Sequence, residues 1–114
     1  MGLLEGKILL VHGGTQGIGG AIARAAVREG ATVTVTGRRR EVGEAFAQEN
    51  GARYVRADMA DPAQAGGAVE DVVREHGRID CLVNAAGLTT RGRMTDTTPA
   101  LFDQHVAINL RGPF

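Results

Sequence analysis

Glycines that could hold a phosphate group cluster in one short stretch near the N-terminus, Gly13-x-x-x-Gly17-x-Gly19. Gly13 would let the chain turn tightly, Gly17 would let the backbone approach a pyrophosphate, and Gly19 would let a helix pack closely on a sheet. The N-terminus of that helix would direct free N–H groups and a partial positive charge at the phosphates. The stretch therefore predicts nucleotide binding, and the alternative is a purely structural glycine-rich turn.

A basic cluster, Gly37-Arg38-Arg39-Arg40, follows the next run of β-branched residues, and residues 31–40 contain no Asp or Glu. Dinucleotide-binding domains selective for NAD place an acidic residue at this point, where it binds the ribose hydroxyls. The guanidinium fork of Arg38 suits a 2′-phosphate instead. This cluster favours NADP over NAD, with Arg39 and Arg40 interpreted as solvated residues at the start of a helix.

The elements that must position these residues alternate between buried strands and amphipathic helices. The strands are expected at residues 7–11, 32–36, 53–57 and 79–83, and the helices at 18–29, 41–48, 62–76 and 99–110. Residues 87–97 form the one long loop. This alternation predicts an α/β fold in which a parallel sheet has helices on both faces.

Helical periodicity also predicts which side chains face the core. The expected buried stripes are Ile18, Ala21, Ile22 and Ala25 in the first helix, Ala65, Val69, Val72, Val73 and His76 in the third, and Phe102, Val106 and Asn109 in the last. Asp61-Pro62 and Thr98-Pro99 have the residue types that begin helices.

Composition excludes several classes of protein. Thirteen basic residues balance thirteen acidic ones, which argues against nucleic-acid and anionic-membrane partners. No apolar run approaches the ~20 residues of a membrane span, and no signal-peptide pattern opens the chain. Cys81 is the one cysteine, and the three histidines lack the spacing of metal ligands. We therefore expect a cytoplasmic protein with no metal site.

Three motifs in this order resemble the short-chain dehydrogenase/reductase family: Val11-His12-Gly13-Gly14-Thr15-Gln16-Gly17-Ile18-Gly19, Asn84-Ala85-Ala86-Gly87 and Asn109-Leu110. The resemblance runs from about Leu4 to the end of the chain. His12 stands where the family usually has Thr, and Ala85 where it often has a second Asn. The spacing Gly14-x-x-Gly17-x-x-Gly20 also fits the extended branch of the family, whereas the other two motifs resemble the shorter branch.

The resemblance implies a Rossmann-like, doubly wound sheet of which this chain supplies strands 1–4, so that residues 1–114 are the N-terminal part of an NAD(P)-binding domain. The implied cofactor-binding residues are Gly13, Thr15, Gln16, Gly17, Ile18, Gly19, Arg38, Asp58, Met59, Asn84, Ala85, Ala86 and Gly87. Asp58 would accept a hydrogen bond from the adenine amino group, or else serve only a turn. Gln16 is a signal against NADP, because some NADP-selective relatives have a basic residue there.

The family transfers a hydride between nicotinamide and an alcohol or carbonyl compound, using a Ser and a Tyr-x-x-x-Lys pair. This chain has no serine, and its single tyrosine and lysine, Tyr54 and Lys7, do not fit the pair. Asn109 matches the catalytic Asn that holds a water for the lysine, unless it is a core or interface residue.

We expect the cofactor-binding half of a homo-oligomeric oxidoreductase with a small-molecule substrate, inactive alone. The alternatives are a non-catalytic dinucleotide-binding module or pseudoenzyme, and a methyltransferase, which would require an acidic residue after the second strand.

Overall fold

A parallel four-stranded sheet forms the centre of the molecule in the computed structural model, which describes residues 2–114. Its strands are β1 (Ile8–His12), β2 (Thr32–Gly37), β3 (Arg53–Arg56) and β4 (Cys81–Asn84). They lie in the order β3-β2-β1-β4, and all three pairings are parallel. The predicted α/β class and the Rossmann-like strand order are therefore confirmed.

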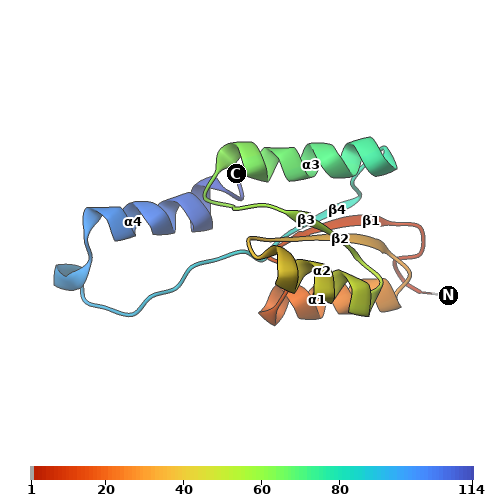
Figure 1. Ribbon diagram of the computed structural model, residues 1–114, viewed down its shortest axis with the longest axis horizontal. Helices are drawn as coiled ribbons and strands as arrows, with labels where there is room; N and C mark the ends of the chain where they lie inside the picture. Colours follow the sequence, from red (N-terminus) through yellow and green to blue (C-terminus); the bar gives the residue numbers. More distant parts are fainter. Residues whose placement is uncertain (1) are drawn as a thin grey trace.

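Helices cover both faces of the sheet, as predicted. Figure 1 shows α1 (Gly17–Arg28) and α2 (Arg40–Asn50) on one face and α3 (Pro62–His76) on the other. The register places His12 level with Thr36 of β2 and Asn84 of β4. The carboxyl ends of these strands consequently meet at one edge of the sheet, where ligands bind in such folds.

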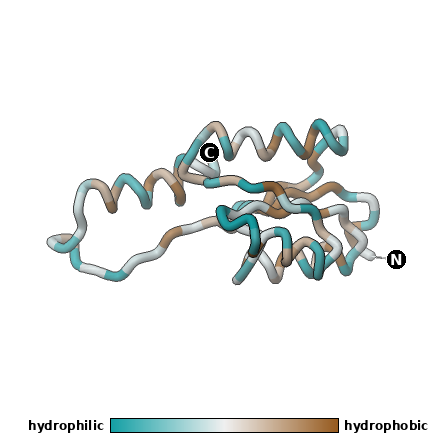
Figure 2. Tube along the Cα trace, in the orientation of Figure 1, coloured by the Kyte–Doolittle hydropathy of each residue, from teal (hydrophilic) through white to brown (hydrophobic). Residues whose placement is uncertain are grey.

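The main core lies between the sheet and the first two helices. Its buried members are Leu9, Val11, Ala23, Ala26, Val33, Val35 and Phe46. Leu10 alternates to the other face of β1, where α3 lies, and both Leu10 and Val72 of α3 are 0% exposed. Hydrophobic residues accordingly concentrate along the strands in Figure 2.

The predicted buried stripe of α1 is wrong. Ile18 is 79% exposed, whereas the buried residues of the helix are Gly19, Gly20, Ala23 and Ala26. A Cβ atom on Gly19 would collide with the carbonyl oxygen of Gly13. The helix therefore presents its smallest side chains to the sheet, because only they permit this close approach.

The prediction for α3 is confirmed only in part, because Val69 and His76 are half-buried. Ala65 and Val72 are buried and Ala68 joins them, but Val73 is 43% exposed. The carboxylate of Asp61 accepts a hydrogen bond of 2.9 Å from the Ala63 N–H at the start of the helix. Gly77, with a φ of 83°, ends it in the left-handed conformation that favours glycine.

Two glycines on the exposed side of α3 give a stability prediction. A Cβ atom on Gly66 or Gly67 would meet nothing within 4 Å. Because glycine is about 0.8–1.0 kcal/mol less favourable than alanine inside a helix, Gly66→Ala and Gly67→Ala should each raise the free energy of unfolding by about that amount in urea titrations. Gly43→Ala is the matched contrast, since its Cβ would collide with the Tyr54 ring. Destabilisation by both α3 variants would contradict the assignment of this face to solvent.

The C-terminal segment extends away from the sheet (Figure 1). A 3-10 turn, η1 (Met94–Asp96), interrupts the predicted long loop, and α4 (Pro99–Val106) continues into a π-helical turn, η2 (Ala107–Arg111). The prediction that Phe102, Val106 and Asn109 are buried is wrong: they share a side of the helix, but no described element covers it. Ile108, 9% exposed, is the buried residue of the turn. No helix among residues 2–114 is long and apolar enough to cross a membrane.

Candidate functional site

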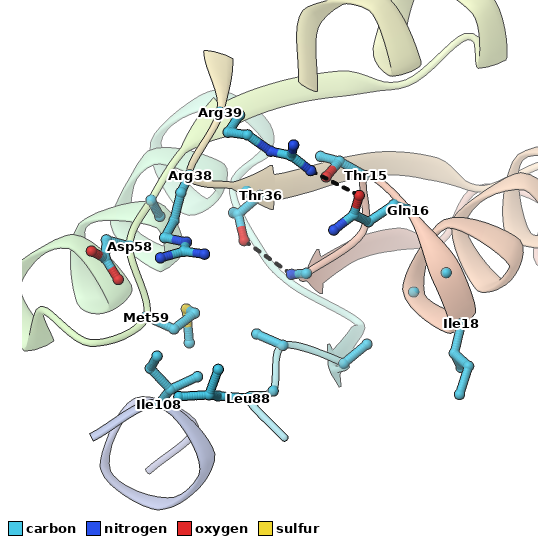
Figure 3. A pocket seen from close by; sticks show the side chains of 18 of the residues that line it. Thr15, Gln16, Ile18, Thr36, Arg38, Arg39, Asp58, Met59, Leu88 and Ile108 are labelled. Atoms are coloured by element: carbon cyan, nitrogen blue, oxygen red, sulfur yellow. Dashed lines mark hydrogen bonds between the residues drawn. The ribbon is translucent and has the colours of Figure 1, made fainter. Parts of the chain in front are cut away.

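A pocket of about 380 Å³ opens at the carboxyl edge of the sheet. All but one of the predicted cofactor-binding residues line it: Gly13, Thr15, Gln16, Gly17, Ile18, Gly19, Arg38, Asp58, Met59, Ala85, Ala86 and Gly87. Figure 3 shows this pocket from close by and labels Thr15, Gln16, Arg38, Asp58 and Met59 among them. The prediction missed seven lining residues, Thr36, Gly37, Arg39, Ala57, Leu88, Gln104 and Ile108. The volume is within the range of ~300–1,000 Å³ typical of ligand sites.

The glycine loop forms one wall and leaves space for an anion. Gly13 has a φ of 73°, and a Cβ atom there would lie 2.6 Å from the backbone nitrogen of Ala86. Gly17 has a φ of 56°, and its missing Cβ faces open space. The first turn of α1 contains no acidic residue, and the side chain of its N-cap residue, Gln16, makes no capping hydrogen bond. The helix N-terminus is thus available to an external negative charge.

A buried histidine at the end of β1 supports the glycine loop. His12 is 3% exposed, and its Nδ1 shares a hydrogen bond of 2.9 Å with the hydroxyl of Thr36. That hydroxyl also accepts from the N–H of Gly13 at 3.4 Å. His12 is therefore part of the support of the loop. Within residues 2–114, no three His, Cys, Asp or Glu side chains form a potential metal site.

His12 also gives a pH prediction. Burial lowers the pKa of His12 below its ordinary value of 6.5, so the unfolded chain takes up a proton at a higher pH than the folded one. The stabilisation from neutral His12 is complete above about pH 6.5 and is lost as the pH falls through the folded-state pKa. Thermal melts between about pH 7 and pH 5 should show a smaller loss of stability in His12→Thr than in the wild type. Parallel curves for the two proteins would exclude this role.

Two arginines reach the pocket from the connection between β2 and α2. Arg38 points inward beside Asp58 and Met59, whereas Arg39 points across the pocket (Figure 3) and donates a hydrogen bond of 2.9 Å to Oε1 of Gln16. Arg39 is exposed at the start of α2, as predicted, but it also lines the pocket because the fold brings the glycine loop within its reach. Arg40 instead pairs with Glu44 in solvent, at 3.5 Å.

The opposite wall is formed by the loop after β3 and by η2. Asp58 Oδ1 accepts a hydrogen bond of 2.9 Å from the N–H of Ala60, so the turn role considered from the sequence is present. A contact from Asp58 to adenine stays a prediction. Met59 is 5% exposed and lies near Ile108 in Figure 3. These two side chains supply an apolar surface suited to a flat base.

Asn84 and Asn109 lie next to the pocket without lining it. Asn84 ends β4, and the following residue, Ala85, donates its N–H to the carbonyl of His12 at 2.9 Å. The side chain of Asn109 accepts from the Leu88 N–H at 2.7 Å and donates to the Leu88 carbonyl at 2.8 Å. Asn109 thus fixes the loop that closes one end of the pocket, and its catalytic role stays a prediction.

Comparisons with known proteins agree with this geometry. A family model described as short chain dehydrogenase matches residues 7–114. The chain belongs to the short-chain dehydrogenase family. Two curated short-chain dehydrogenase relatives are a 3-alpha-(or 20-beta)-hydroxysteroid dehydrogenase of Mycobacterium tuberculosis, 39% identical, and an NADP-dependent (R)-specific alcohol dehydrogenase of Lentilactobacillus kefiri, 37% identical.

The matches cover nearly all of this chain and less than half of each relative. They span 99% of the chain and 44% of the hydroxysteroid dehydrogenase, and 97% of the chain and 46% of the alcohol dehydrogenase. A solved structure, a blue fluorescent protein from a metagenomic library in complex with NADPH, matches with a TM-score of 0.92 and 38% identity. That match covers 97% of this chain and 48% of the other. This short-chain dehydrogenase sequence therefore spans about half the length of its relatives.

Proposed function

We propose that residues 1–114 are the cofactor-binding part of an NADP(H)-dependent oxidoreductase that interconverts a small alcohol and its carbonyl compound. The observation that supports NADP(H) most directly is the set of residues that follows β2 and lines the pocket. Gly37 removes the side chain that would carry a competing carboxylate, and Arg38 and Arg39 both line the pocket. Guanidinium groups bind phosphate through paired, charge-assisted hydrogen bonds. The NADPH complex of the metagenomic relative and the NADP dependence named for the Lentilactobacillus enzyme support the same choice.

The pocket residues divide into parts that suit different groups of a dinucleotide. The glycine loop and the N-terminus of α1 would bind the pyrophosphate. Asp58 and Met59 would contact adenine, and the segment Asn84–Ala86 would contact the ribose through its backbone. Gly87 would leave room for the nicotinamide, which supplies the hydride when the cofactor is bound. Asn109 would hold Leu88, and with it this end of the site, in place.

The acid–base step requires residues other than the tyrosine and lysine of this chain. The hydroxyl of Tyr54 donates to the carbonyl of Gly37 at 2.6 Å, and burial raises the pKa of Tyr54 above its ordinary value of 10.0. Lys7 lies just before β1. The proposed activity therefore belongs to a full-length protein whose further sequence supplies the family's Ser and Tyr-x-x-x-Lys. A homo-oligomeric assembly belongs to the same proposal and rests on the resemblance, and a cytoplasmic location rests on the composition.

Calorimetry on the full-length protein tests this function directly. NADPH should bind more tightly than NADH by a factor of about ten or more, the factor for one hydrogen bond to a charged group. Purified protein should oxidise NADPH in the presence of a panel of ketones and aldehydes. Tight binding without turnover on any carbonyl compound would favour the non-catalytic module. Absence of dinucleotide binding would contradict both functions.

A further inference from the structure

We propose that Arg56 and Gln64 are positioning residues that fix the separation between the two walls of the adenosine end of the pocket, and so set how much a 2′-phosphate adds to binding. One wall carries Arg38 and the other carries Asp58. Neither Arg56 nor Gln64 lines the pocket, so both act through the residues that they hold. The inference rests on the proposed function, because it assumes an adenosine ligand with a 2′-phosphate.

Arg56 holds the wall that carries Arg38. It is the last residue of β3, and its Nε donates a hydrogen bond of 3.1 Å to the carbonyl of Arg38. The sheet itself pairs Gly37 with Arg56, and the Ala57 N–H donates to the Gly37 carbonyl at 3.2 Å. The Arg56 side chain therefore also binds the backbone one residue beyond the end of β2. That residue is Arg38, whose guanidinium points into the pocket (Figure 3).

Gln64 holds the opposite wall. It is the third residue of α3, a position from which a Gln side chain often accepts from the N-cap backbone N–H. Here the N–H of Asp61 donates to the carbonyl of Asp58 at 3.0 Å, and Gln64 Oε1 accepts from the N–H of Asp58 at 2.9 Å. Gln64 Nε2 donates to Asp61 Oδ2 at 3.0 Å. Both ends of the amide are therefore fixed.

The two side chains meet and complete a bridge behind the pocket. Arg56 Nη1 donates to Gln64 Oε1 at 3.3 Å. The bridge thus runs from the Arg38 carbonyl through Arg56 and Gln64 to the Asp58 N–H. A ligand with adenine and a 2′-phosphate must contact both walls at once, and walls already held at the right separation lose less entropy on binding.

The test compares 2′,5′-ADP with 5′-AMP, which differ in the 2′-phosphate alone, by calorimetry on the full-length protein. The measured quantity is the ratio of the dissociation constant of 5′-AMP to that of 2′,5′-ADP. Arg56→Lys keeps the charge but replaces the planar fork, whose two nitrogens meet the two acceptors, with one ammonium nitrogen on a flexible stem, and Gln64→Ala removes the other half of the bridge. Each should lower the ratio about fivefold, the factor for one hydrogen bond of ordinary net strength. The double variant should lower it no further, because either change already breaks the bridge.

Arg40→Lys and Gln48→Ala are the matched controls, since both residues are exposed on α2 and neither lines the pocket. They should leave the ratio unchanged, and melting curves of all variants establish that each is folded. If Gln64→Ala does not fold, Arg56→Lys and its control decide the question. An unchanged ratio in Arg56→Lys, or equal weakening of both ligands, would overturn the bridge while leaving the proposed function intact. A wild-type protein without preference for 2′,5′-ADP would instead contradict the NADP(H) function.

Discussion

Gly17→Val is expected to abolish dinucleotide binding in the full-length protein, with a loss of more than about 100-fold, while most of the helix content remains. Gly17 has a φ of 56° and faces open space at the N-terminus of α1. A β-branched residue is strongly disfavoured in this left-handed region. Its methyl groups would also occupy the space that we assign to the pyrophosphate.

Calorimetry with NADPH measures the loss, and circular dichroism measures the helix content. Gly6→Val is a matched control, because Gly6 has a φ of 76° and open space around it but lies before β1, away from the pocket. It should lose stability in the same way and still bind NADPH. Unchanged affinity in Gly17→Val would mean that the glycine loop is not the phosphate site.

Arg38→Ala should weaken NADP(H) binding roughly ten- to hundredfold and leave NAD(H) binding nearly unchanged. A hydrogen-bonded contact to a charged group contributes about 1.5–3 kcal/mol, which corresponds to this factor. The side chain of Arg38 points into the pocket (Figure 3), where a 2′-phosphate is the group that distinguishes the two cofactors.

Titrations of both cofactors against the wild type, Arg38→Ala and Arg40→Ala separate a direct contact from a general effect of charge. Arg40 pairs with Glu44 in solvent, so its removal should alter the preference for NADP(H) far less. Equal losses for NADP(H) and NAD(H) in Arg38→Ala would reject the assignment of this arginine to the 2′-phosphate.

The sequence by itself predicted the alternating elements, and its motifs, through the family that they resemble, implied the strand order and most of the pocket lining. The elements follow from local information, because alternating periodicities predict them, and parallel strands joined by helices leave few topologies. The glycine spacing fixes where the first strand turns into a helix, and the residues that follow each strand must then gather at one edge. Twelve of the predicted cofactor-binding residues line the pocket for this reason. Asn84 ends β4 beside it.

The tertiary structure alone decided the buried faces of α1 and α4 and which side chains pair across the pocket. Ile18 was expected inside, but the close approach of α1 to the loop at Gly13 requires the small residues there instead. Asn109 shares a helical face with Phe102 as expected, yet periodicity cannot say whether anything covers that face. The contacts of Arg39 with Gln16 and of Asn109 with Leu88 join residues more than 20 positions apart. Such contacts depend on how the strand ends meet in space, and a local sequence pattern does not predict which ends will meet.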